Sequence, residues 1–227
     1  MTTATPKIPQ IAVSTSVPKW QRATWEDYLR LRDDPILERV RLFFNTNYLF
    51  VDMGNEGINH ASIARLFAML FYIWFTCFPE QTASDLGGVL LEKANTQAAS
   101  PDIVLYIGEG VPEWKPGESR YINLNQWRVP DLVCEVGDTT LSSDLDEQKK
   151  LYATLGVPEY WVIDVRGKRV FAFLLQSDGT YKLCTESVAL KGLPIAILDQ
   201  TLERLDEGTN ISAASWFAQA IANLNQG

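Results

Sequence analysis

The chain has 227 residues, of which 46% are hydrophobic and 21% are charged, which suits one globular domain of medium size. Its formal net charge of −8 excludes a surface coated with basic residues, so any phosphate-binding surface must be local. The three cysteines (Cys77, Cys134 and Cys184) are far apart, and His60 is the single histidine. These counts argue against a disulfide framework or a zinc site, and they favour a reducing, cytoplasmic compartment.

The N-terminal residues 1–20 are expected to form a flexible tail, because Thr, Ser and Pro are frequent there and apolar residues are scattered. Residues 21–227 are expected to form a single domain. A helix is predicted to begin after Thr24, with Asp27 at the capping-box spacing. Two strands are predicted next, at residues 40–44 and 48–51.

The most hydrophobic segment is the uncharged run Leu66–Phe78, which lies in a helix predicted over residues 59–78 and ended by Pro79. This run is shorter than the roughly 20 residues that are needed to span a bilayer. The helix also lacks a basic face that would hold it on a membrane surface. A buried core helix is therefore expected, and no membrane association.

The second half of the chain alternates strands and helices. Strands are predicted at residues 89–91, 103–107, 132–136, 160–163, 170–175 and 181–184, and helices at residues 142–155 and 213–224. A long loop over residues 108–128 separates two of the strands. The order predicts an α/β fold with a mixed β-sheet flanked by helices and a C-terminal strand meander.

Two acidic residues stand at or inside apolar strands. Asp102 follows Pro101, and Glu135 lies within the run Pro130–Gly137, where Asp131 and Glu135 share one face. Burying an unpaired carboxylate costs several kcal/mol, so a partner is expected. Carboxylates on neighbouring strands suit a divalent metal such as Mg²⁺, which prefers oxygen ligands.

Simpler roles are open for both acids. Asp102 can start a strand after a proline, and Glu135 can form a structural salt bridge with Lys149 or Arg128. Asp131 stands at the mouth of its strand, where a turn or supporting role is expected. His60 opens the long helix and is expected to be a surface or capping residue, with a substrate contact as the other reading.

Several stretches of the chain carry a family likeness: Ser100–Val104, Pro130–Val136, Asp144-Leu145-x-Glu147 with Leu151-Tyr152, and Gly156–Asp164. They resemble a restriction-endonuclease-like family that is abundant in cyanobacteria and belongs to the PD-(D/E)XK nuclease superfamily. The resemblance covers roughly residues 24–205. It implies a restriction-endonuclease-like fold and an endonuclease that hydrolyses phosphodiester bonds of DNA with Mg²⁺ or Mn²⁺.

By this matching, Asp102 and Glu135 are the metal ligands. The superfamily's lysine, two residues after the second acid, is replaced by Gly137, and the position of the family's lysine in the following helix is Gln148. The resemblance implies that Gln148 or Lys149 takes the lysine's place and that activity is weakened. On a helix, position 148 faces inward with Tyr152, whereas Lys149 lies about 100° further around the helix axis than position 148.

A second departure lies upstream, where the family often has Arg-Tyr-Glu and this chain has Arg39-Val40-Arg41. A supplementary acid is lost at Arg41, which is grouped with Asp131 and His60 as a supporting or substrate-contacting residue. The hypothesis is a metal-dependent DNA endonuclease. A homodimer is expected, because cutting both strands of DNA needs two active sites and one chain supplies one. The alternative is a nuclease-fold protein that has lost catalysis and acts as a binding or regulatory module.

Overall fold

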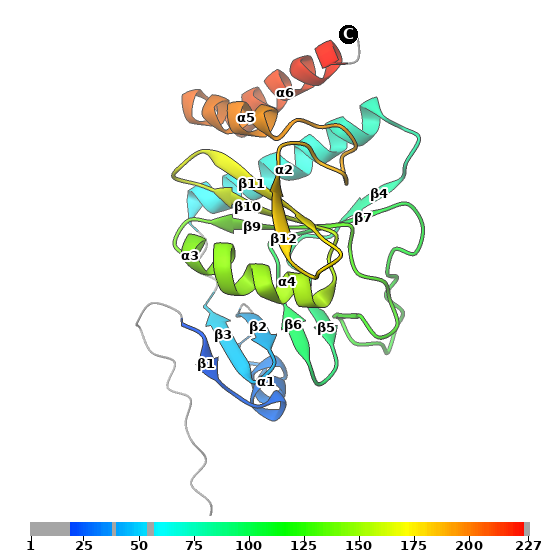
Figure 1. The fold of residues 1–227 in the computed structure, drawn as a ribbon, viewed down its shortest axis with the longest axis vertical. Helices are drawn as coiled ribbons and strands as arrows, with labels where there is room; N and C mark the ends of the chain where they lie inside the picture. The colour runs from blue at the N-terminus through cyan, green and yellow to red at the C-terminus, as the bar shows by residue number, and fades with distance from the viewer. Residues whose placement is uncertain (1–18, 38–39, 54–56, 225–227) are drawn as a thin grey trace, which may run out of the picture.

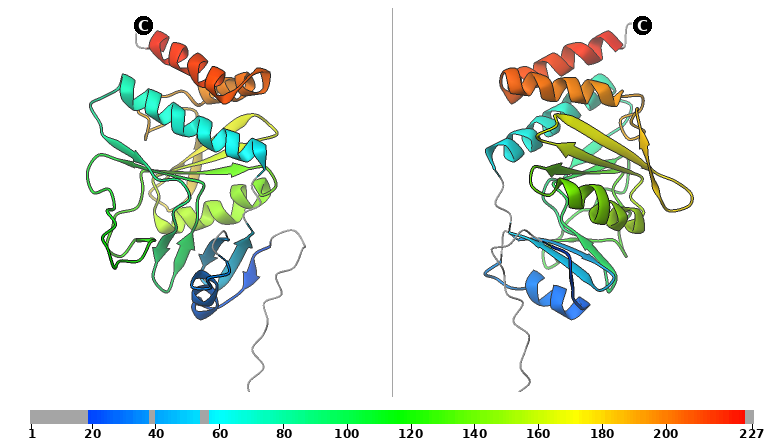
Figure 2. Two further views of the ribbon diagram at one scale, coloured as in Figure 1. Left: turned by 180° about the vertical axis from the view of Figure 1, so that it is seen from behind. Right: turned by 60° about the vertical axis from the view of Figure 1, so that its left-hand side comes forward.

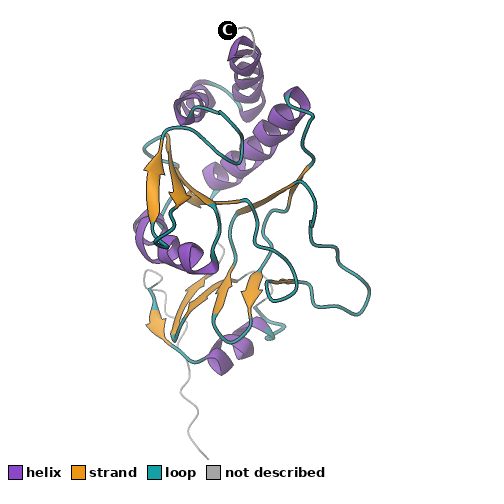
Figure 3. Ribbon diagram, turned by 45° about the vertical axis from the view of Figure 1, so that its right-hand side comes forward, coloured by secondary structure: helices purple, strands orange, loops and turns teal. Residues whose placement is uncertain are grey.

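A computed structural model describes residues 19–37, 40–53 and 57–224 of the chain (Figure 1). The tail predicted at residues 1–20 therefore lies almost wholly outside the described residues. The strands divide between two six-stranded sheets, each with one parallel pair among antiparallel ones. The α/β class with mixed sheets and flanking helices is confirmed, and the division into two sheets is a finding beyond the prediction (Figure 3).

The N-terminal sheet has the strand order β1-β3-β2-β6-β5-β8. Its strands are short: β1 (Gln21–Arg22), β2 (Arg41–Asn45), β3 (Tyr48–Asp52), β5 (Leu91–Lys93), β6 (Gln97–Ala99) and β8 (Ile122–Asn123). The hairpin of β2 and β3 turns at Thr46 and Asn47, both of which have positive φ. Helix α1 (Trp25–Arg32) packs on this sheet, and Thr24 and Asp27 cap it reciprocally, as the sequence predicted.

The central sheet has the order β12-β11-β10-β9-β7-β4. Its strands are β4 (Ala83–Asp85), β7 (Ile103–Ile107), β9 (Leu132–Gly137), β10 (Glu159–Asp164), β11 (Arg169–Leu175) and β12 (Tyr181–Cys184). The antiparallel run β10-β11-β12 is the predicted meander. All residues of β9 and β10 are buried, because helices cover both faces of the sheet at this point (Figure 2).

One face of the central sheet is covered by α2 (Ile58–Cys77), above which lie α5 (Ile195–Glu207) and α6 (Asn210–Leu224). Side chains that alternate along β9, such as Cys134 and Val136, pack into this core. Helix α2 is longer than the apolar run seen in the sequence, and its length and mean hydropathy of 1.3 would suffice for a membrane span. In the fold it packs on β9 and α6, and 39% of this apolar window is buried, so one face of the expected core helix is covered.

The other face of the central sheet carries a helical segment of three parts, α3 (Leu141–Ser143), the π-helical turn η1 (Asp144–Gln148) and α4 (Lys149–Leu155). This segment connects β9 to its parallel neighbour β10, and Gly156 ends it with a positive φ. It lies between the central sheet and the N-terminal sheet (Figure 1). Val133 and Glu135 of β9 face this side, as the alternation of the strand predicts.

Candidate functional site

The chain crosses between the two sheets at Ser100, Pro101 and Asp102. Ser100 continues the pairing of β6 with β2, because its hydroxyl group bonds to both the amide nitrogen and the carbonyl oxygen of Leu42. Asp102 stands immediately before β7 of the central sheet. Because Ile103 of β7 pairs with Cys134 of β9, Asp102 lies next to Glu135, and the crossing brings the N-terminal sheet against this end of β7.

Arg41, the first residue of β2, reaches across from the N-terminal sheet to both acids. Its Nη1 lies 2.9 Å from Oδ1 of Asp102, and its Nη2 lies 2.6 Å from Oε2 of Glu135. Its Nε donates to the carbonyl oxygen of Ser100 at 2.9 Å. One guanidinium therefore holds two buried carboxylates and the loop between the sheets.

Further groups form hydrogen bonds or ion pairs with the two acids. Asp102 accepts a hydrogen bond at Oδ2 from the backbone amide of Val136 at 2.7 Å, and His60 Nε2 lies 3.2 Å from its Oδ1. Glu135 accepts at Oε1 from the hydroxyl group of Tyr152, at 2.5 Å. Every carboxylate oxygen of the pair thus has at least one partner.

Burial and charge act in opposite directions on these groups. Burial disfavours ionisation of Asp102, but Arg41 and His60 outweigh it, so the pKa of Asp102 lies below its ordinary value. Burial raises the pKa of Glu135 well above its ordinary value, and Arg41 opposes this shift. Burial also disfavours the charge of Arg41, but Glu135 and Asp102 overcome it and raise the pKa of the guanidinium.

A third buried acid lies next to this pair. Asp144, in η1, is 1% exposed and accepts a hydrogen bond from the hydroxyl group of Thr140 at 2.8 Å. A Cβ atom at Gly137 would stand 2.9 Å from its Oδ2 and 3.2 Å from Cα of Leu141, so a larger residue at the end of β9 would displace the Asp144 carboxylate. Burial raises the pKa of Asp144 to about 7, and Asp102 and Asp52 add to this shift.

Gln148 lies one turn after Asp144 and one turn before Tyr152, on the inward face of the helical segment, as predicted. Its side chain is buried, and within the described part of the chain its Oε1 has no hydrogen-bond partner. Lys149 is placed elsewhere: its ammonium group lies 4.7 Å from the centre of the Phe173 ring on β11.

Asp131 is also placed away from the two acids. Its Oδ2 accepts from the backbone amide of Ile107 at 2.6 Å and lies 2.8 Å from Nη1 of Arg128. It thus fastens the loop before β9, which is the turn role considered from the sequence. The partner of Glu135 is Arg41, and the salt bridges considered with Lys149 or Arg128 are not formed.

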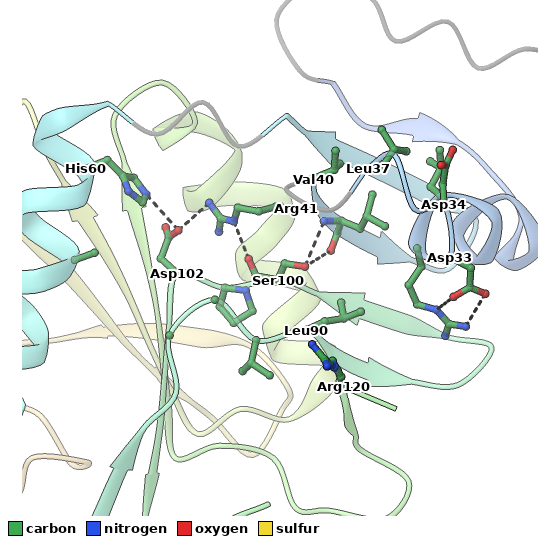
Figure 4. Close-up of a pocket in the computed structure, with 18 of the residues that line it drawn as sticks. Asp33, Asp34, Leu37, Val40, Arg41, His60, Leu90, Ser100, Asp102 and Arg120 are labelled. Atoms are coloured by element: carbon green, nitrogen blue, oxygen red, sulfur yellow. Dashed lines mark hydrogen bonds and ion pairs between the residues drawn. The ribbon is translucent and has the colours of Figure 1, made fainter. Parts of the chain in front are cut away.

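A pocket of about 1090 Å³ opens beside Arg41 and Asp102 (Figure 4). Its lining includes basic residues from several elements, namely Arg32, Arg41, His60, Arg65 and Arg120. It also includes the acids Asp33, Asp34 and Asp102. Arg65 and Arg120 are exposed, and Arg120 makes no hydrogen bond or ion pair with any described residue. Arg32 is paired with Asp33 and Glu92, and Arg41 is paired with Asp102 and Glu135. The pocket therefore offers the cationic groups of Arg65 and Arg120 to a ligand, in a chain that is acidic overall.

The donor set at the two acids was predicted to hold Mg²⁺ or Mn²⁺. Carboxylate oxygens on neighbouring strands have the right chemistry, but the guanidinium of Arg41 lies between them. Among residues 19–37, 40–53 and 57–224, no group of three His, Cys, Asp or Glu side chains is arranged to hold a metal. The residues present therefore do not fit a divalent cation in this arrangement.

The fold is shared with a solved structure, and the sequence matches a family model. A solved structure described as "a putative nuclease belonging to DUF820 from Anabaena variabilis ATCC 29413" superimposes with a TM-score of 0.55 over 79% of this chain and 99% of that one, at 16% identity. Residues 25–206 match the model of the Uma2 family, described as "Putative restriction endonuclease". The chain belongs to the Uma2 family. No curated protein sequence matches the chain.

The sequence pointed to most of the site, but it missed two features. Asp102, Glu135 and Gln148 were singled out and lie in the cluster. The expectation that His60 is a surface or capping residue is wrong, because His60 is 7% exposed and its Nε2 lies 3.2 Å from Oδ1 of Asp102. Arg41 was grouped as a supporting or substrate-contacting residue at a lost acid, and its contact with both acids depends on how the two sheets meet. Asp144 was quoted only as part of a family motif, and the glycine seven residues before it is the signal for its close approach.

Proposed function

We propose that the protein binds the phosphodiester backbone of DNA in the arginine-lined pocket and acts as a binding or regulatory module built on a nuclease fold. The observation that carries this proposal is the pocket itself, where the exposed Arg65 and Arg120 line one hollow of a chain whose net charge is −8. Guanidinium groups match phosphate geometry by paired hydrogen bonds.

Hydrolysis is not expected, for two reasons. Glu135 is 2% exposed and held by Arg41 and Tyr152, so it offers no free oxygen to an incoming group. The long side chain at position 148 is a neutral glutamine, which cannot supply a positive charge to a developing phosphoryl anion.

The second candidate is the Mg²⁺- or Mn²⁺-dependent DNA endonuclease that the family resemblance implies. One observation favours it: Asp102 and Glu135, from neighbouring strands, come close enough to contact the same side chain. On this account Asp102 and Glu135 would be the residues that hold the ion, whose contribution would be positive charge at the phosphate. Arg41 would have to leave its present place first.

Binding is tested with a labelled DNA duplex, by fluorescence anisotropy in buffer that contains EDTA. Reversing an exposed pocket charge with Arg120→Glu is expected to weaken binding by about tenfold or more, because one phosphate contact is replaced by repulsion. The matched control is Arg204→Glu, an exposed arginine on α5 outside the pocket, which should leave affinity unchanged. If both variants bind DNA with the same affinity as the wild type, then the pocket does not contact DNA.

Cleavage is tested separately, with supercoiled plasmid and Mg²⁺ or Mn²⁺. We expect no nicking by the wild type above the level of Glu135→Gln. Metal-dependent nicking that Glu135→Gln abolishes would establish the endonuclease instead. The anisotropy assay in EDTA is independent of this result, so DNA binding and DNA cleavage are decided one at a time.

A further inference from the structure

We propose that the guanidinium of Arg41 takes the place of a divalent cation between Asp102 and Glu135, so that this site excludes Mg²⁺ and Mn²⁺. The inference rests on the proposed function in one respect, that a site without a metal binds DNA rather than cutting it. It concerns a single side chain and the charge that it supplies.

The first step is the fit of the guanidinium. All three of its nitrogens are used, Nη1 on Asp102, Nη2 on Glu135 and Nε on the carbonyl oxygen of Ser100. The side chain also packs over the ring of Phe43, with 5.3 Å between the guanidinium carbon and the ring centre. Its backbone is fixed by strand pairing with β3. Such a group is preorganised in its place and does not swing out freely.

The second step is the use of the carboxylate oxygens. On the sides away from Arg41, Oδ2 of Asp102 accepts from the amide of Val136, and Oε1 of Glu135 accepts from Tyr152. A cation that bound both acids would have to replace these hydrogen bonds or the guanidinium. Leaving any of these buried donors without a partner is unfavourable, and most of all for the charged guanidinium.

The third step is charge. Arg41 is nearly enclosed, with 17% of its side chain exposed, and a guanidinium stays charged in proteins. A divalent ion at the same acids would lie within a few ångströms of this charge, in surroundings that screen it poorly. Position 148 agrees with this arrangement, because a lysine in place of the buried Gln148 would add a second cation beside Arg41.

The test is Mn²⁺ binding, measured by electron paramagnetic resonance at physiological salt and neutral pH, without DNA. The wild type is expected to show no stoichiometric Mn²⁺ site. Arg41→Glu removes the guanidinium and adds a third carboxylate, and it should bind one Mn²⁺ at least about a hundredfold more tightly than the wild type. The control Arg204→Glu makes the same change of charge on α5 and should behave as the wild type.

One Mn²⁺ bound by the wild type and lost in Glu135→Gln would overturn the inference, and this titration decides even if Arg41→Glu does not fold. A folded Arg41→Glu protein that gains no Mn²⁺ site would also overturn it. The anisotropy measurement in EDTA contains no metal. A protein that binds DNA in EDTA and also binds one Mn²⁺ therefore refutes this inference alone, and one that binds neither refutes the DNA proposal alone.

Discussion

Arg41 connects groups from separate parts of the chain. Its guanidinium touches the loop after β6, the first residue before β7 and the middle of β9. Two buried acids that repel each other are tolerable because this one cation lies between them. The same contacts make Arg41 a structural residue as well as part of the proposed binding pocket.

Removing Arg41 should destabilise the fold strongly. We expect Arg41→Ala to lower the free energy of unfolding by about 3–5 kcal/mol at pH 8, because it leaves buried carboxylates without their cation. Arg41 lowers the pKa of Asp102, so the stability it supplies is present above the ordinary pKa of an aspartate and is lost as pH falls through the lowered value. The loss measured by urea unfolding should therefore be smaller in strong acid, and an equal loss at all pH values would contradict this role.

Asp144 gives a second pH dependence of opposite sign. Its pKa rises from 3.8 in the unfolded chain to about 7 in the fold, so the folded state favours the protonated acid. The stability it contributes is full below pH 3.8 and falls as pH rises through 7. The stability of Asp144→Asn relative to the wild type should therefore rise between pH 5 and pH 8.5 by about 3 kcal/mol, because about 2 units of the pKa shift lie in that range at 1.36 kcal/mol per unit.

The matched control for Asp144 is Asp146→Asn, which changes an exposed acid of the same helical turn. It should leave the pH dependence of unfolding unchanged. If Asp144→Asn and Asp146→Asn show the same profile, then Asp144 is ionised in the fold at neutral pH.

At the scale of elements, the unit β9-α3-η1-α4-β10 sets the geometry of the site. β9 delivers Glu135, the π-helical turn brings Asp144 against Gly137, and α4 carries Tyr152 to Glu135. The inward face of this segment repeats at every fourth residue, through Asp144, Gln148 and Tyr152. A π-helical turn at this point accords with the frequent use of such turns at functional sites.

The substitution Gln148→Lys tests whether the absence of a lysine is all that prevents catalysis at this site. With Arg41 in place, Gln148→Lys would add a second buried cation, so we expect lower stability by several kcal/mol and no gain in plasmid nicking. Glu147→Lys, on the exposed side of the same turn, is the control and should be nearly neutral. Increased nicking by Gln148→Lys alone would mean that only the lysine is missing.

The sequence predicted the longer elements well. The β2-β3 hairpin, the helix α2, the strand β9 and the meander were all placed within a few residues, because hydrophobic period and turn residues mark them. The strands β1, β4, β6 and β8 were not predicted, since two or three residues show no period. Helix α5 was also missed. Sequence patterns locate elements, but they do not say which sheet a short strand will join.

The site was predictable only in part, because local sequence patterns reveal some of its residues but not the contacts between distant segments. Asp102 and Glu135 are visible as acids at apolar strands, and the family likeness adds Gln148. The contact of Arg41 with both acids spans 61 and 94 residues of sequence, so it depends on how the two sheets meet. The contact of Lys149 with the Phe173 ring likewise depends on how α4 packs on the central sheet.

At the scale of the whole molecule, the proposed DNA binding requires one local basic patch, because the chain is negative overall. Affinity should therefore fall with salt, with a slope of about −0.9 per phosphate neutralised when log K is plotted against log salt concentration. Replacing Arg120 by alanine should reduce the magnitude of that slope by about 1, whereas Arg204→Ala should not change it. Affinity that is independent of salt would show that the arginines of the pocket do not contact phosphate.

The homodimer stays a prediction, and its reason changes. It was expected because cutting two strands needs two sites, and that need disappears when the site binds without cutting. Light scattering with and without duplex DNA measures the oligomeric state directly. We expect DNA binding in EDTA whichever state is found, since the pocket lies within one chain.

The most direct test of the account is a crystal structure determined after soaking in Mn²⁺, with anomalous scattering recorded to locate the metal. The account predicts no manganese between Asp102 and Glu135, and a guanidinium that contacts both carboxylates as it does here. A manganese ion bound to both acids, with Arg41 turned away from them, would contradict it.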